Sequence, residues 1–112
     1  MINKKSIEEA INIYGEQTYK FVSLTLNDAD NFLDAIGASI SNKNESMLSI
    51  SAHSLEAVML QAGAHEVAHE AVKLEKMGKS RDLAGAPELL KNLRSLYTET
   101  KKILKELAED AK

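Results

Sequence analysis

Apolar residues recur every three or four positions along most of the chain, which is the spacing of amphipathic helices. The stripes predict four long helices, over about residues 17–41, 45–61 and 64–77 and from Pro87 to near the C-terminus. Short connections make consecutive helices antiparallel neighbours, and an up-down-up-down four-helix bundle buries four stripes in one core. We therefore expect an all-α fold of this architecture.

Polar residues and glycines mark where these helices begin and end. A short additional helix is expected at the N-terminus, because Ser6 and Glu9 have the spacing of a capping box. Residues 41–44 have the composition of a loop, and residues 79–85 read as a polar connector. Three glycines are suited to end the helices that precede them: Gly15, Gly63 and Gly78.

Composition narrows the functional classes. The chain has 112 residues, enough for one domain with a modest core. Its net charge is −3 with both signs interspersed, and the absence of a basic stripe argues against nucleic acid as a partner. It has no cysteine, which excludes disulfides and thiolate metal sites. Neither a long apolar run nor a signal peptide is evident, so we expect a cytoplasmic protein without membrane contact.

One histidine stands out in the helix expected over residues 45–61. At about 100° per residue, the apolar positions of this helix fall within roughly 40° of one line. These positions are Leu48, Ala52, Leu55, Met59 and Ala62. His53 lies about 140° from that line, on the solvent side, together with Ile50, Ala57 and Leu60. An exposed histidine among small and apolar residues suggests a docking surface with a nucleophile at its centre.

Residues 52–64 resemble the active-site helix of histidine-containing phosphotransfer (HPt) domains. The pattern of that family is Ala-His-x-Leu-Lys-Gly-[Ser/Ala]-x-x-x-[Leu/Ile]-Gly-Ala. Five positions match it in place: Ala52, His53, Leu55, Gly63 and Ala64. The resemblance extends over nearly the whole chain, since the helices expected before and after this segment are similar to those of the family in length and spacing. Residues 1–112 are therefore expected to form a single HPt-like domain.

Two departures from the family pattern lie closest to the expected chemistry. Ala57 replaces the usual glycine, which adds one methyl group and leaves the surface open to a partner. Glu56 replaces the usual lysine, and its charge would repel a phosphoryl group on His53. We expect both Glu56 and His53 to be exposed, so that solvent screening limits this repulsion to about 0.5 kcal/mol. A working phosphoacceptor is therefore the favoured interpretation.

The resemblance implies a phosphorelay (two-component signalling) intermediate. His53 would accept a phosphoryl group from the aspartate of one receiver domain, at Nε2 by family precedent, and pass it to another receiver. The receivers would belong to response regulators or to a hybrid histidine kinase, and would supply Mg²⁺. The chain would have no cofactor, ATP site or metal of its own, would not be an enzyme in the strict sense, and is expected to be a monomer. The expected partner-binding residues are Ile50, Ser54, Glu56, Ala57, Leu60 and Gln61.

Two alternatives remain open. In one, Glu56 prevents phosphorylation and the protein is an HPt-like binding module. In the other, His65, Glu66 and His69 form the H-E-x-x-H signature of zinc hydrolases, with Glu88 as a third ligand. The apolar stripe of residues 64–77 places these side chains on the outer face, which favours solvated histidines over a zinc site.

Overall fold

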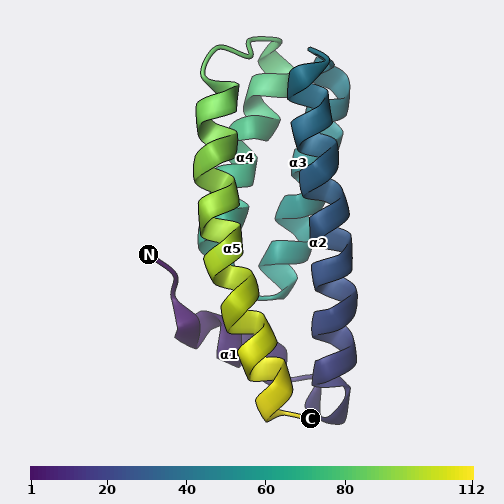
Figure 1. Cartoon of the computed structure of the whole chain (residues 1–112), viewed down its shortest axis with the longest axis vertical. Coiled ribbons are helices and arrows are strands. Elements are labelled where there is room, and N and C mark those ends of the chain that lie inside the picture. The colour runs from purple at the N-terminus through teal and green to yellow at the C-terminus, as the bar shows by residue number, and fades with distance from the viewer.

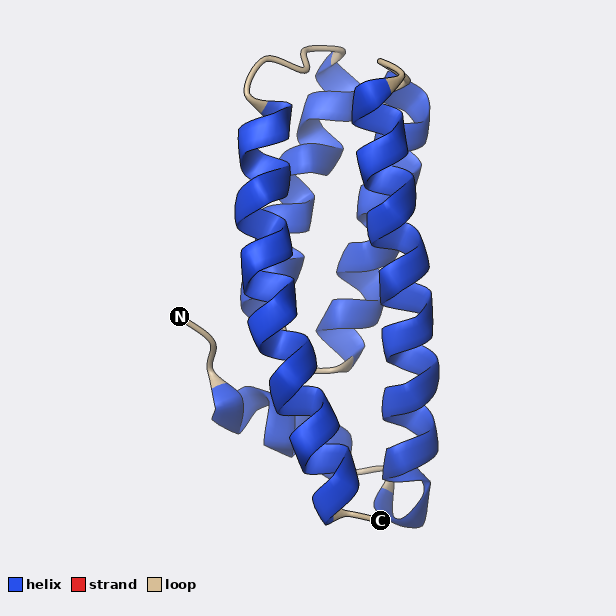
Figure 2. Ribbon diagram, in the orientation of Figure 1, coloured by secondary structure: helices blue, strands red, loops and turns tan.

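Four long antiparallel helices form the body of the molecule, and a short N-terminal helix lies across one end (Figure 1). The structure is a computed structural model that describes residues 1–112. Its helices are α1 (Lys4–Asn12), α2 (Thr18–Ser41), α3 (Glu45–Gln61), α4 (His65–Ser80) and α5 (Ala86–Asp110), with a 3₁₀ turn, Gly15–Gln17, before α2. There is no strand (Figure 2), and the predicted all-α bundle is confirmed.

The helices differ in length, and this difference makes room for α1. Helices α2 and α5 have 24 and 25 residues, whereas α3 and α4 have 17 and 16. The lower ends of α2 and α5 therefore extend past the α3–α4 turn, and α1 packs in the space below that turn (Figure 1). The hydroxyl of Ser6 on α1 donates to the carbonyl of Gly63 in the turn, at 2.7 Å. None of the helices combines the length and the apolar character needed to cross a bilayer.

The predicted apolar stripe of α3 forms the centre of the core. Leu48, Ala52, Leu55, Met59 and Ala62 all have 0 % exposed surface, as their spacing predicted. They pack against the stripes of α2 and α4, the two neighbours of α3 in the bundle. Because this face of α3 is fully buried, the opposite face is fixed toward solvent along the whole helix.

Two of the predicted helix boundaries need correction at the N-terminus. Asn3, not Ser6, is the N-cap of α1, because its side chain accepts a hydrogen bond from the amide of Ser6. Ser6 instead lies inside the helix and uses its hydroxyl to hold Gly63. Helix α1 ends at Asn12, and Gly15 begins the next turn. Gly63 does end α3 as predicted, with φ of 73° in the left-handed region.

Gly78 was predicted to end the fourth helix, and this prediction is wrong. Helix α4 continues to Ser80, and Arg81 forms the left-handed C-cap at φ 57°. Gly78 is buried inside the helix against the backbone of α3: a β-carbon on it would lie 2.7 Å from the carbonyl oxygen of Glu45 and 2.7 Å from the amide nitrogen of Ser49. The glycine therefore permits a close approach of α3 and α4. The connector to α5 is correspondingly shorter than expected, residues 81–85.

Candidate functional site

His53 projects from the middle of α3 into solvent. Its side chain is 67 % exposed, which agrees with the orientation that the helical spacing predicted. It borders a shallow hollow between α3 and α4, lined by Ser49, Ile50, His53, Ser54, Glu75 and Lys79. An imidazole in this position is open to another macromolecule on one side and supported by the bundle on the other.

The supported edge of the ring contacts a carboxylate of α4. Nδ1 of His53 lies 3.1 Å from Oε2 of Glu75. An ionised carboxylate can only accept a hydrogen bond, so Nδ1 carries the proton and donates a hydrogen bond to Glu75. A neutral imidazole has one N–H, and this contact therefore leaves Nε2 with a free lone pair on the exposed side. Glu75 fixes both the tautomer and the orientation of the ring.

Glu75 is held in its charged form. Its side chain is only 11 % exposed, and Nζ of Lys79 lies 3.0 Å from Oε2. Burial alone would raise the pKa of Glu75. The hydrogen bond and charge of Lys79, and the contact with His53, outweigh burial and lower that pKa below its ordinary value. Glu75 is therefore ionised at neutral pH and available to accept from His53.

Glu56 also faces the histidine. Its Oε1 lies 3.6 Å from Nδ1 of His53, one turn away on the same helix. Its side chain is only 23 % exposed, so the expectation that Glu56 is well exposed is wrong. Solvent screens its charge less than we assumed. Two carboxylates and one ammonium group, that of Lys79, thus surround the protected edge of the ring.

The residues predicted to bind a partner lie around His53 on the outer face of α3. Ile50 and Leu60 are 60 % and 50 % exposed, which is unusual for large apolar side chains, and Ala57 and Gln61 are exposed as well. Ser54 is half-buried, and its hydroxyl donates to the carbonyl of Ile50 at 2.9 Å, so it is occupied within the helix. An apolar strip that a partner could cover therefore runs along α3 on both sides of His53.

The side chains of the H-E-x-x-H segment do not converge. His65 and His69 are exposed on α4, as predicted. Glu66 is half-buried rather than fully on the outer face, and its Oε2 accepts from the backbone amide of Asn3 at 3.1 Å. The one group of three His or acidic side chains whose donor atoms lie within 4.8 Å of one another is elsewhere, at His53, Glu56 and Glu75. The geometry therefore does not favour a zinc hydrolase.

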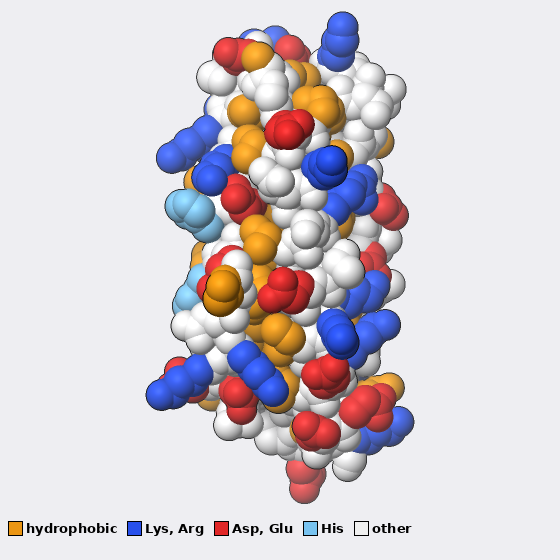
Figure 3. Space-filling model, turned by 60° about the vertical axis from the view of Figure 1, so that its left-hand side comes forward, with side chains coloured by type: hydrophobic (Ala, Val, Ile, Leu, Met, Phe, Trp, Pro, Cys, Tyr) orange, Lys and Arg blue, Asp and Glu red, His pale blue; other side chains and the backbone are white.

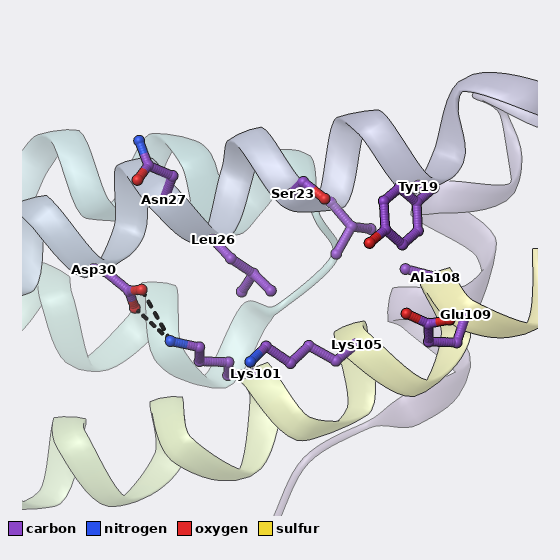
Figure 4. Close-up of a pocket in the computed structure, with 10 residues that line it drawn as sticks. Tyr19, Ser23, Leu26, Asn27, Asp30, Lys101, Lys105, Ala108 and Glu109 are labelled. Carbon is purple, nitrogen blue, oxygen red and sulfur yellow. Dashed lines mark hydrogen bonds and ion pairs between the residues drawn. The ribbon is translucent and has the colours of Figure 1, made fainter. Parts of the chain in front are cut away.

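A second hollow lies between α2 and α5, away from the histidine site (Figure 4). It has a volume of about 570 Å³ and includes Asp30 and Lys101, whose charged groups approach to 2.9 Å. The hydroxyl of Tyr97 also donates to Asp30, at 2.7 Å. These bonds tie α2 to α5, and the hollow contains no histidine or other ready nucleophile. We assign it a structural role.

Surface charge does not point to a polyanionic partner. On the face shown in Figure 3, acidic and basic side chains are interspersed, with hydrophobic patches between them. This mixture agrees with the net charge of −3 and with the predicted lack of a basic stripe.

The antiparallel bundle and the exposed histidine of α3 agree with what the resemblance of the sequence to HPt domains led us to expect. Among solved structures, the chain is similar to the crystal structure of histidine-containing phosphotransfer protein B (HptB) from Pseudomonas aeruginosa PAO1. The TM-score is 0.89 over 97 % of this chain and 95 % of that chain, at 16 % sequence identity. No protein-family model and no curated protein match the sequence. The likeness shows that this chain has the HPt fold, including the short N-terminal helix.

The sequence pattern placed His53 on the exposed face of α3, as the structure shows, but it did not single out Glu75 or Lys79. Both lie on α4, 22 and 26 residues after the histidine, in a segment rich in lysine and glutamate. Their four-residue separation is a signal for an ion pair within a helix, but such pairs are common on solvent faces. Only the packing of α4 against α3 reveals that this pair faces the histidine.

Proposed function

We propose that this protein is a phosphorelay intermediate in which His53 accepts a phosphoryl group from the aspartyl phosphate of one receiver domain and passes it to the aspartate of another. The observation that carries this proposal is the exposed imidazole of His53, in which the lone pair of Nε2 is free because Nδ1 donates to Glu75. The HPt fold of the chain supports it. Cytoplasmic location and action as a monomer remain part of the proposal.

The transfer step uses the groups of this site as follows. The lone pair of Nε2 forms a bond to phosphorus while the bond from phosphorus to the aspartate oxygen breaks, and the carboxylate leaves with that electron pair. The ring becomes a phosphorylated imidazolium, with the proton still on Nδ1. Glu75 is then a carboxylate beside a cationic ring, and it stabilises the charge that develops in the transition state. Return transfer to a second aspartate reverses these steps.

The partner would supply what the site lacks. Residues of this chain offer no phosphate-binding loop, and Lys79 is the one cation that contacts the site. Mg²⁺ and the acidic pocket would therefore belong to the receiver. The receiver would cover Ile50, Ala57, Leu60 and the edges formed by Ser54, Glu56 and Gln61. Such a contact must be small and short-lived, because a shuttle that bound tightly could not turn over.

The test is phosphoryl transfer from a labelled receiver to wild-type protein and to His53→Gln. We expect an acid-labile, alkali-stable label on the wild type and none on the variant, whose far-ultraviolet circular dichroism should be unchanged. Label that persisted on His53→Gln would exclude this histidine. Profiling against every receiver domain of the source genome would then identify the partners.

One observation favours a second candidate, a binding module that carries no phosphate. Oε1 of Glu56 is 3.6 Å from the imidazole in a half-buried position, where its repulsion of a phosphoryl group is less screened than on open surface. Such a module would bind receivers with the same strip of α3. A Glu56→Lys variant that became labelled, when the wild type did not, would establish this alternative.

A further inference from the structure

We propose that His53, Glu56 and Glu75 form a binding site for a divalent transition-metal ion, with Zn²⁺ the best suited, and that a bound ion prevents phosphorylation of His53. The second part rests on the proposed function, whereas the metal site itself does not. Each of the three residues offers one donor atom, and these atoms lie within 4.8 Å of one another. Nδ1 of His53 contacts Oε2 of Glu75 and Oε1 of Glu56.

The spacing of these atoms suits a tetrahedral ion. Zinc bonds to histidine nitrogen and carboxylate oxygen are about 2.0–2.1 Å long, so two ligands at the tetrahedral angle are about 3.3 Å apart. The distances from Nδ1 are 3.1 Å to Glu75 and 3.6 Å to Glu56, on either side of that value. Rotation of the two glutamate side chains would bring one oxygen of each onto an ion bound at Nδ1, since the donor atoms of the three residues lie within 4.8 Å of one another. Water can fill the fourth position from the exposed side of the ring.

The origin of the ligands also fits a metal site. His53 and Glu56 are one helical turn apart on α3, and Glu75 reaches them from α4. Helical bundles build metal sites in this way, from a histidine and a carboxylate three residues apart together with a carboxylate of a facing helix. The side chain of Glu75 is only 11 % exposed and already contacts the ring, so little ordering is needed on binding. One histidine and two carboxylates are a donor set that zinc accepts.

Lys79 is the one group of the site that would repel a bound cation. Its Nζ lies 3.0 Å from the Glu75 oxygen that would bind the metal. The ion must therefore displace the ammonium group of Lys79 from this oxygen. Two carboxylates and one ammonium group together give the site a net charge of about −1 around a neutral histidine. Lysine at position 56, as in the HPt pattern, would remove one ligand and reverse the sign of that charge. Glu56 therefore supplies both the third ligand and the negative charge that make this edge of the ring a cation site.

Metal binding and phosphorylation require opposite tautomers of His53. A metal on Nδ1 needs the lone pair of that nitrogen, so the single proton of the neutral ring moves to Nε2. Nε2–H has no lone pair in the ring plane and cannot attack phosphorus. In the metal-free site, Glu75 holds the proton on Nδ1 and Nε2 stays nucleophilic. A bound ion therefore prevents phosphorylation of His53 without blocking access to Nε2.

Calorimetric titration of tag-free protein with zinc chloride tests the metal site. We expect one site per chain, and Glu56→Lys and His53→Gln should each weaken binding at least about tenfold, since even the loss of an outer-shell partner of a metal costs that much. Lys79→Gln should strengthen it. The matched control is a His65→Gln, His69→Gln double variant, which removes the other histidines and should bind as the wild type does. No stoichiometric binding, or binding lost in the control and kept in Glu56→Lys, would overturn the site.

Phosphoryl transfer measured with and without one equivalent of zinc tests the competition. The ratio of the two rates should fall well below one for the wild type and stay near one for Glu56→Lys. An equal fall in both would place the inhibiting ion on the receiver and overturn the competition. Absence of any transfer would overturn the competition together with the proposed function, while the calorimetric result would still decide the metal site.

Discussion

Gly78 of α4 lies directly against the backbone of Ser49 of α3. A β-carbon on Gly78 would be 2.7 Å from the amide nitrogen of Ser49, closer than such atoms pack. Ser49 is one turn before His53, and Gly78 is one turn after Glu75. The two helices therefore approach closely beside the site, and this contact helps to set how far the Glu75 carboxylate reaches toward the imidazole.

Gly78→Ala should destabilise the fold and loosen the site. The added methyl group meets backbone atoms, which cannot move aside as a side chain can, and overpacking of this kind costs about 1–3 kcal/mol. The higher helix propensity of alanine offsets up to about 1 kcal/mol of this cost. We expect a net loss of roughly 1–2 kcal/mol in the free energy of unfolding, measured by urea denaturation. If transfer requires the His53–Glu75 contact, the rate of phosphorylation should fall as well.

Gly37→Ala is the matched control for this prediction. A β-carbon on Gly37 would also have a neighbour at 2.7 Å, but that neighbour is a guanidinium nitrogen of Arg94, at the end of a flexible exposed side chain. Arg94 can move away, so only the gain in helix propensity remains, up to about 1 kcal/mol. Equal destabilisation by both substitutions would contradict the assignment of Gly78 to a close helix contact.

Glu75→Gln should keep the imidazole of His53 in place but weaken its activation as a nucleophile. Glutamine can still accept from Nδ1–H, but a neutral hydrogen bond contributes roughly 1 kcal/mol less than one to a charged group, so we expect transfer to slow about fivefold. Glu75→Leu removes the acceptor altogether and should slow it further. Nitrogen-15 shifts of the imidazole provide a second measurement. They should report one tautomer in the wild type and a mixture in Glu75→Leu. A single tautomer in both proteins would contradict a positioning role for Glu75.

The position of His53 could be predicted because it depends on one helix alone. Once Leu48, Ala52 and Leu55 are placed in the core, the period of the α-helix turns His53 to solvent. The four-helix architecture followed from the same reasoning, since each stripe needs a neighbour to cover it. Local periodicity carries this information without any knowledge of the neighbours.

Glu75, Lys79 and Gly78 could not be assigned in this way, because their roles depend on how two helices meet. A glycine near a helix end has the same appearance whether it terminates the helix or admits a neighbouring backbone. The sequence also does not distinguish the buried Glu75 from Glu66 and Glu70, the half-buried glutamates of the same helix. Asn3 was overlooked for a related reason: Ser6 and Glu9 have capping-box spacing, but the chain offers an earlier N-cap.

Asp30→Asn should lower stability at neutral pH and have little effect in acid. Burial would raise the pKa of Asp30, but the hydrogen bonds from Tyr97 and Lys101 and the charges of Lys101 and Lys105 hold it below its ordinary value of 3.8. A lowered pKa in the folded state stabilises the protein above the unfolded-state pKa, and this contribution disappears as pH falls through the folded-state pKa. The carboxylate is 43 % exposed, so we expect about 1 kcal/mol or less.

Urea unfolding of the wild type and of Asp30→Asn across acidic and neutral pH would measure this contribution. The difference between them should be largest near neutrality and shrink once the pH is well below about 4. Asp34→Asn, at an exposed position one turn further along α2, provides the control and should change the free energy of unfolding little at neutral pH. A difference for Asp30→Asn that stayed constant with pH would mean that packing, rather than the charge, accounts for the effect.

The charges around His53 should determine what fraction of the protein is phosphorylated in equilibrium with a receiver. Glu56 repels the phosphoryl group and Lys79 attracts it. The exposed charge of Lys79 contributes about 0.5 kcal/mol, or roughly twofold in an equilibrium constant, and the less screened charge of Glu56 contributes at least as much. Glu56→Lys changes the charge at position 56 by two, so it should raise the phosphorylated fraction in equilibrium with a receiver about fourfold or more. Lys79→Gln should lower that fraction about twofold. Both effects should weaken as salt is added, because screening reduces interactions between exposed charges. Quantitative transfer at low and high ionic strength would measure them, and an unchanged fraction in Glu56→Lys at low salt would show that Glu56 does not act on the phosphoryl group through its charge.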